Sequence, residues 1–107
     1  MNFDEIAEQT IPHMKGGDGV VKARISDDGK VKIMRGVLEP GSSIGLHKHE
    51  ETSEVVYVID GVMTVLMEGK KELYHQGEVH YCPKGSSHEI RNEGKKTLVC
   101  LCVVPKQ

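Results

Sequence analysis

Two histidines and a glutamate stand close together in the segment GLHKHEETSEVVYVIDG, residues 45–61. His47 and His49 are two positions apart, so on an extended strand their side chains point to the same face. Glu54 lies at an odd offset from both, so it reaches that face only if the chain bends within EETS, residues 50–53. Two imidazoles and a carboxylate suit Fe, Mn, Ni, Co or Zn, and three protein ligands leave positions for substrate. The segment therefore predicts a site for one divalent transition metal.

A fourth ligand has to come from another strand, and His88 is the favoured residue. It follows the tight turn PKGSS, residues 83–87, and alternation along HEIRN aims it to the same face as Ile90 and Asn92. Taken alone, each of these residues would more often be a solvated surface residue than a ligand. We expect the remaining histidines outside the site: His75 and His80 at surface positions of strands, and His13 in an N-terminal loop.

The elements that must position these ligands are strands almost throughout. The turn DDG lies between apolar runs at 20–26 and 30–38 and predicts a hairpin, and the DG pair at 60–61 predicts a second hairpin between 53–59 and 62–68. Further short runs, separated by Gly-rich or Lys-rich turns, bring the total to about eight strands, the pattern of an all-β sandwich or barrel. Residues 3–9 favour a helical turn weakly, and KGGDG at 15–19 is typical of a mobile connector.

Glycines and prolines around the ligands complete two motifs, at residues 41–61 and 77–92, that resemble the signature motifs of the cupin superfamily. The resemblance covers about half of the chain, and all ten fixed positions agree: Gly41, His47, His49, Glu54 and Gly61, then Gly77, Pro83, Gly85, His88 and Asn92. It implies a jelly-roll β-barrel with one divalent metal in its mouth. It also carries the 3-His/1-Glu ligand set of the family onto His47, His49, Glu54 and His88.

Length and composition limit the remaining possibilities. A chain of 107 residues with a net charge of −2 predicts one domain, residues 1–107 with an N-terminal arm at 1–19, and gives no basic footprint for nucleic acid. The acidic N-terminus and the absence of a long apolar run predict a cytoplasmic protein that does not cross a membrane. Three cysteines without CxxC spacing predict reduced thiols rather than a disulfide framework or a zinc ribbon.

Three residues near the predicted site are candidates for a catalytic role: Arg35, Tyr81 and Cys102. Arg35 stands in an apolar strand and could anchor a carboxylate or phosphate, although an outward, solvated position is equally open. Tyr81 could donate a proton to a bound ligand. Cys102 shares a face with Leu98 and Cys100, and if that face lines the barrel its thiol lies near the metal; otherwise it is a small buried apolar residue.

The motifs leave three functions open, with a small polar metabolite as the partner in each. The slightly favoured one is a metal-dependent oxygenase; the others are a redox-neutral isomerase, lyase or decarboxylase, and a module that binds or senses a small ligand without converting it. No organic cofactor is expected. Apolar residues on both faces of 54–60 and 97–104 also predict a homodimer, with Tyr57 on the outer face.

Overall fold

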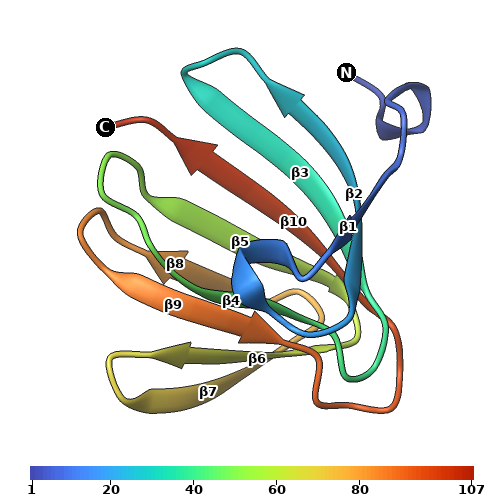
Figure 1. The fold of residues 1–107 in the computed structure, drawn as a ribbon, viewed down its shortest axis with the longest axis vertical. Helices are drawn as coiled ribbons and strands as arrows, with labels where there is room; N and C mark the ends of the chain where they lie inside the picture. The colour runs from blue at the N-terminus through green and yellow to red at the C-terminus, as the bar shows by residue number, and fades with distance from the viewer.

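The computed structural model describes residues 1–107, and it consists of ten strands and two short 3-10 helices (Figure 1). Alternating apolar residues and Gly-containing turns account for the short strands, which agrees with the expected all-β class. The helices are η1 (Phe3–Glu5) and η2 (Met14–Gly16). The strands are β1 (Gln9–Pro12), β2 (Val20–Asp27), β3 (Val31–Leu38), β4 (Ser43–Lys48), β5 (Glu54–Asp60), β6 (Val62–Met67), β7 (Lys70–His75), β8 (Val79–Cys82), β9 (Ser87–Arg91) and β10 (Leu98–Pro105).

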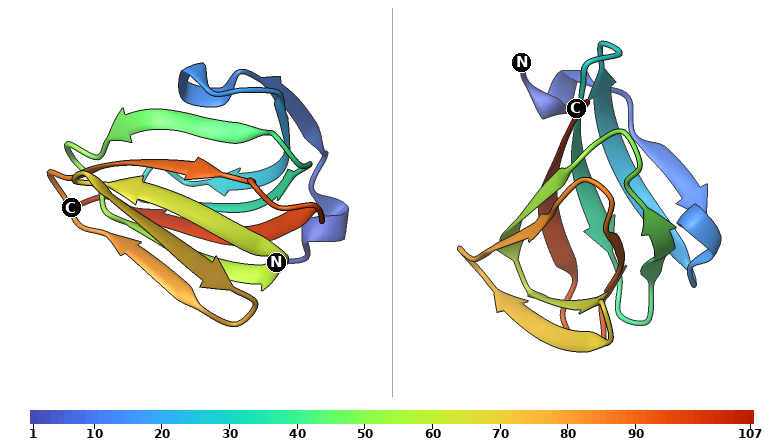
Figure 2. Two further views of the ribbon diagram at one scale, coloured as in Figure 1. Left: turned by 90° about the horizontal axis from the view of Figure 1, so that it is seen from below. Right: turned by 90° about the vertical axis from the view of Figure 1, so that its left-hand side faces the viewer.

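The strands form two antiparallel sheets that face one another around an apolar interior (Figure 2). One sheet has six strands in the order β1-β2-β3-β10-β5-β8, and the other has four in the order β4-β9-β6-β7. Residues that alternate along β3, β5 and β10 fill the space between the sheets, among them Met34, Val56, Val58, Cys100 and Cys102. This confirms the predicted jelly-roll barrel.

The turn signals differ in what they connect. Residues 28–30 join β2 and β3 as a hairpin, as the DDG pattern predicts, and the Asp28 carboxylate accepts hydrogen bonds from the Lys30 and Val31 amides. The second predicted hairpin, at Asp60–Gly61, is wrong. β5 pairs with β10 and β8, whereas β6 pairs with β7 and β9, so this turn carries the chain from one sheet to the other.

The N-terminal segment packs against the barrel instead of hanging free. The helical turn expected within residues 3–9 is present as η1, but it covers residues 3–5 alone. After η1 the chain forms β1, which pairs with the outer edge of β2. The expected mobile connector at 15–19 is not a loose linker, because η2 and Gly17 lie against β4 (Figure 1). A Cβ atom on Gly45 would collide with the carbonyl of Lys15 and the amide of Gly17, so only glycine permits this contact.

Neither helix has the length or the apolar character needed to span a bilayer.

Candidate metal centre

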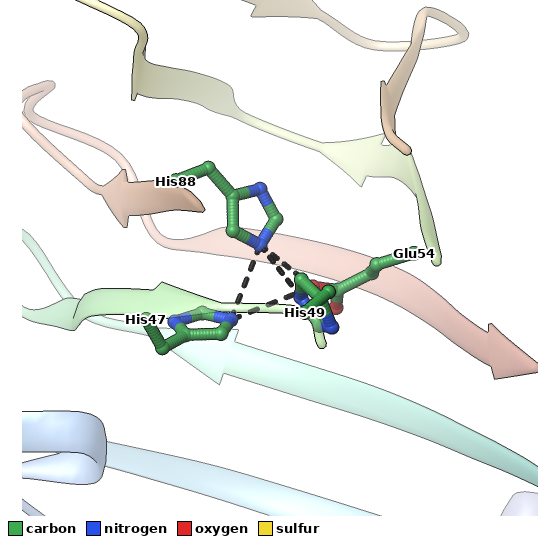
Figure 3. Close-up of side chains that lie close together, drawn as sticks. All are labelled: His47, His49, Glu54 and His88. Atoms are coloured by element: carbon green, nitrogen blue, oxygen red, sulfur yellow. Dashed lines mark hydrogen bonds and ion pairs between the residues drawn. The ribbon is translucent and has the colours of Figure 1, made fainter. Parts of the chain in front are cut away.

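Four side chains from both sheets converge at one end of the barrel interior: His47, His49, Glu54 and His88 (Figure 3). The Nε2 atom of His88 lies 2.8 Å from Oε1 of Glu54, 3.1 Å from Nε2 of His47 and 3.1 Å from Nε2 of His49. Oε1 of Glu54 is also 3.0 Å from Nε2 of His49 and 3.7 Å from Nε2 of His47. The sequence prediction named these four residues, and the structure brings all four together.

Two local features of the backbone orient these four side chains. The pairing of β4 with β9 contains a bulge between Ile44 and His47, so Ile44 opposes Ile90 and His47 opposes His88. Beyond β4 the chain bends at residues 50 and 51 and crosses to the other sheet, where Glu54 opens β5. The bend that the odd offset of Glu54 required is therefore present, and it lets the carboxylate face the histidines.

Each histidine of the cluster has a partner for its outer ring nitrogen. Nδ1 of His47 lies 2.7 Å from the Gly45 carbonyl oxygen, and Nδ1 of His49 lies 2.8 Å from the Thr52 hydroxyl. A carbonyl oxygen can only accept, so Nδ1 of His47 donates this hydrogen bond, and the tautomer that does so leaves the Nε2 lone pair toward the centre of the cluster. Such partners are the usual means by which metal-ligating imidazoles are oriented.

The donor set fits a divalent transition metal in chemistry and in spacing. Metal–ligand bonds of about 2.1 Å place neighbouring ligand atoms about 3.0 Å apart around an octahedral ion and about 3.4 Å apart around a tetrahedral one. Five of the six separations between the cluster atoms are 2.8–3.7 Å, which includes this range, and all four atoms lie within 4.8 Å of one another. Burial raises the pKa of Glu54, but hydrogen bonds with His47, His49 and His88 outweigh it and hold that pKa well below its usual range. The carboxylate is therefore ionised, as a metal ligand must be.

The cluster opens into a cavity of about 230 Å³ between β3, β4 and η2. Its lining combines apolar residues with three lysines, and Glu54 is the only carboxylate among them: Met14, Lys15, Lys32, Met34, Ile44, His47, Lys48, His49, Thr52, Glu54 and Val104. The volume is below the range of about 300–1,000 Å³ that is typical for sites of drug-sized ligands. The cavity therefore suits a small ligand, and its positive lining favours an anion.

Two of the three candidate catalytic residues lie away from this cavity. Arg35 faces outward from β3, where its guanidinium lies 5.6 Å above the Phe3 ring and 3.8 Å from Asp4. Tyr81 is exposed on the outer face of β8. Arg35 thus takes the outward position that the sequence left open, and there it contacts the N-terminal segment.

Cys102 points into the barrel and is fully buried beside Cys100, with 4.0 Å between the two sulfur atoms. The Cys100 thiol and burial raise the pKa of Cys102 well above its ordinary value, and the nearby Glu54 carboxylate adds to the effect. The thiol is therefore protonated and a poor nucleophile at neutral pH. All three cysteines are free and buried.

The sequence prediction for His80 is wrong. Its side chain is 1% exposed, and its Nε2 lies 2.9 Å from Nδ1 of His88. Burial, followed by the proximity of His88, lowers the pKa of His80 to about 4, so the ring is neutral at pH 7. His75 is exposed as expected, and His13 lies outside the cluster. Strand alternation could have predicted this burial, because His80 and the buried Cys82 share one face of β8.

Lys32 is a second residue that the sequence prediction passed over in favour of Arg35. Alternation along β3 places Lys32 on the same face as the buried Met34, whereas Arg35 takes the opposite face. A guanidinium is the better anchor for a carboxylate or phosphate, which favours Arg35 in the sequence. Strand alternation instead places Lys32 at the cavity.

The fold agrees with comparisons to known proteins. The sequence profile of the cupin domain matches residues 34–104. The chain is a cupin. It is also 35% identical over 106 residues to the oxalate-binding protein of Thermotoga maritima, an alignment that covers 94% of this chain and 88% of that protein.

Two further comparisons match proteins whose names describe different activities. A crystal structure from Thermotoga maritima, described as a predicted oxalate decarboxylase, superposes with a TM-score of 0.93 at 33% identity and covers 99% of this cupin and 97% of that chain. The quercetin 2,3-dioxygenase of Bacillus subtilis is 30% identical over 57 residues, which are 53% of this cupin but only 17% of that enzyme. Cupins commonly bind a metal, and the cluster of His47, His49, Glu54 and His88 could bind one here.

Proposed function

We propose that this cupin holds one divalent transition metal on His47, His49, Glu54 and His88 and uses it to bind a small carboxylate anion. The observation that carries the proposal is the combination of this cluster with a cavity of about 230 Å³ that three lysines line. With one carboxylate and three neutral imidazoles as ligands, a divalent ion would retain positive charge and free positions for carboxylate oxygens. The likeness to an oxalate-binding protein supports a dicarboxylate of this size.

The protein groups around the cluster have complementary tasks in such a site. Glu54 neutralises part of the charge of the ion, and the three histidines hold their Nε2 atoms toward it. Lys32 and Lys48 add positive charge to the lining and attract the anion. The apolar residues Met34, Ile44 and Val104 exclude water from one side of the bound anion. The lining offers no second carboxylate and no tyrosine to move a proton, which favours binding over proton-transfer chemistry.

Titration calorimetry with oxalate tests the proposal. We expect 1:1 binding to protein loaded with Mn²⁺ or Co²⁺ and none to the metal-free protein. Lys32→Met should weaken binding about two- to five-fold, as expected for a partly screened charge pair. Lys70→Met is the matched control, because Lys70 is exposed on β7 and away from the cavity. Equal binding with and without metal, or no binding to either form, would contradict the proposal.

An enzyme acting on the same small anion is the second candidate, and the oxygenase chemistry that the sequence favoured belongs to it. Four protein ligands would leave coordination positions for a substrate and for oxygen, and similarity to a dioxygenase and to a predicted oxalate decarboxylase supports this candidate. Oxygen uptake and CO₂ release, measured with oxalate over hours on the metal-loaded protein, distinguish the two. Oxalate that is bound but fully recovered favours the binding module, whereas its consumption favours the enzyme.

A further inference from the structure

His80 forms a contact that neither the ligand set nor the cavity explains. It stands on β8 of the six-stranded sheet, and its Nε2 lies 2.9 Å from Nδ1 of His88 on β9 of the four-stranded sheet. The two ring centroids are 5.1 Å apart, and the rings are tilted by 32°. A second buried imidazole thus contacts the outer nitrogen of a cluster histidine, the position that a carbonyl or hydroxyl takes at His47 and His49.

The contacts continue from His80 to the protein surface. Its Nδ1 lies 3.4 Å from the Tyr74 hydroxyl, which donates a hydrogen bond of 3.1 Å to the exposed Glu72 carboxylate. Tyr74 and Glu72 belong to β7, the edge strand of the four-stranded sheet, whereas β8 is the edge strand of the other sheet. The four residues therefore form a continuous series of side chains from the cluster, across the place where the two edges meet, to solvent.

The direction of each hydrogen bond follows from the role proposed for His88. If Nε2 of His88 binds a metal, its neutral ring carries the proton on Nδ1, and that N–H donates to Nε2 of His80. The proton of His80 is then on Nδ1 and donates to the Tyr74 oxygen, whose own hydrogen already points to Glu72. Every donor has one acceptor, and the series ends on a negative charge.

We propose that His80 is the positioning residue of the metal site: it fixes the tautomer and ring orientation of His88 and, through Tyr74 and Glu72, increases the electron donation of its Nε2. This inference rests on the proposed metal site. A partner on the outer nitrogen of a ligating histidine contributes about 10–100-fold to metal affinity. The same dependence is therefore expected of His80, although His80 does not reach the metal.

Metal affinity of matched variants tests the inference. We expect His80→Leu to weaken Zn²⁺ or Co²⁺ binding about 10–100-fold. His80→Gln, whose amide oxygen can accept the same hydrogen bond, should stay within about three-fold of the wild type. His75→Gln is the control, because His75 is exposed on β7. Wild-type affinity in a folded His80→Leu variant, or equal losses in His80→Leu and His80→Gln, would overturn the positioning role.

Nuclear magnetic resonance of the wild-type protein gives a readout that a packing role would not produce. With ¹⁵N-labelled histidine and Zn²⁺ bound, we expect a proton on Nδ1 of His88 and a scalar coupling between that nitrogen and Nε2 of His80 across the hydrogen bond. No coupling between these two nitrogens would refute the inference even if His80→Leu fails to fold. A proton on Nε2 of His88, or a wild-type protein that binds no Zn²⁺, would refute the metal site itself, which separates the two failures.

Discussion

His47 and His88 are direct partners in the pairing of β4 with β9, and their Nε2 atoms lie 3.1 Å apart. They are 41 residues apart in the sequence, yet the two-strand ladder fixes their Cα positions against one another. Half of the proposed ligand set therefore sits on regular, hydrogen-bonded backbone, and such positions are more rigid than loop positions. His49, just past the end of β4, and Glu54, at the start of β5, complete the set from either side of a bend.

Removal of one ligand should abolish metal binding without unfolding the barrel. We expect His49→Ala to lose stoichiometric metal content, because only three of the four ligand atoms would remain around the ion. Elemental analysis of protein purified without chelator measures the content, and circular dichroism checks the fold. His75→Ala is the control, since that imidazole is exposed and does not belong to the cluster. Full metal occupancy in the His49→Ala variant would show that the assignment is wrong.

The sequence predicts the fold class and the four members of the cluster because fixed spacings carry that information. Gly41, Gly61 and Gly85 adopt positive φ angles of about 90°, a conformation that strongly favours glycine. The residue type alone therefore indicates a turn at each of these positions. Strand alternation likewise predicts an outward Tyr57, as the structure has it, but it leaves the face of Cys102 open, and the structure places that thiol inward.

Other features depend on long-range pairing that local patterns do not record. The Asp60–Gly61 turn has a hairpin sequence, but the pairing of β5 with β10 requires contacts with residues some 40 positions later, and the turn instead joins the two sheets. The bulge between Ile44 and His47 reverses the alternation of β4, which no strict period-two pattern predicts. The polarity of His80 favours a surface position, but its hydrogen bond with His88 offsets the cost of burying it.

The contact between η2 and β4 yields a prediction on stability. Gly45→Ala should destabilise the protein by about 1–3 kcal/mol, because the new methyl group meets the backbone of Lys15 and Gly17 and forces η2 away. Urea unfolding measures the change. Gly94→Ala is the matched control, since its Cβ would meet only the Asn92 side chain at 3.5 Å. Equal stability of the Gly45→Ala variant and the wild type would show that η2 does not pack on β4 in solution.

Thiol labelling should reveal the burial of the cysteines. Burial, followed by the Glu54 and Glu68 carboxylates, raises the pKa of Cys82 to about 11. Its reactive thiolate is therefore scarce at pH 8, and its labelling rate in the metal-free protein should rise about ten-fold per pH unit through pH 9 and 10. An ordinary thiol with a pKa of 9.0 levels off above that pH. Peptide mapping after pulses of a thiol reagent measures each rate, and a plateau for Cys82 near pH 9 would contradict the raised pKa.

Bound metal should also change the labelling of Cys102. Its thiol faces the interior near Glu54, so an ion on the proposed ligands should stiffen that region and slow the modification of Cys102. Parallel pulses with and without Zn²⁺ measure the protection, and the same peptide map follows Cys82 for comparison. Identical labelling rates for Cys102 in both samples would show that metal binding does not affect the surroundings of this thiol.

The outer face of β5 and β8 carries the apolar surface that a dimer would bury. Tyr57, Ile59, Val79 and Tyr81 are between 37% and 53% exposed, and Tyr57 lies directly opposite Val79 in the strand pairing. A sheet face toward water normally alternates apolar with polar residues, and a contiguous apolar patch usually marks an interface. We therefore expect a homodimer in which these faces pack about a two-fold axis.

Light scattering of single variants tests this dimer. Tyr57→Glu should yield a mass near that of one chain, 11.8 kDa, at micromolar concentration, because the pairing would bury two uncompensated carboxylates, one from each protomer. Leu73→Glu is the matched control: Leu73 is 56% exposed, but it lies on β7 of the other sheet and should leave the mass of the dimer unchanged. A wild-type protein that elutes with the mass of one chain would refute the dimer. Dissociation by Leu73→Glu but not by Tyr57→Glu would instead locate the interface on the four-stranded sheet.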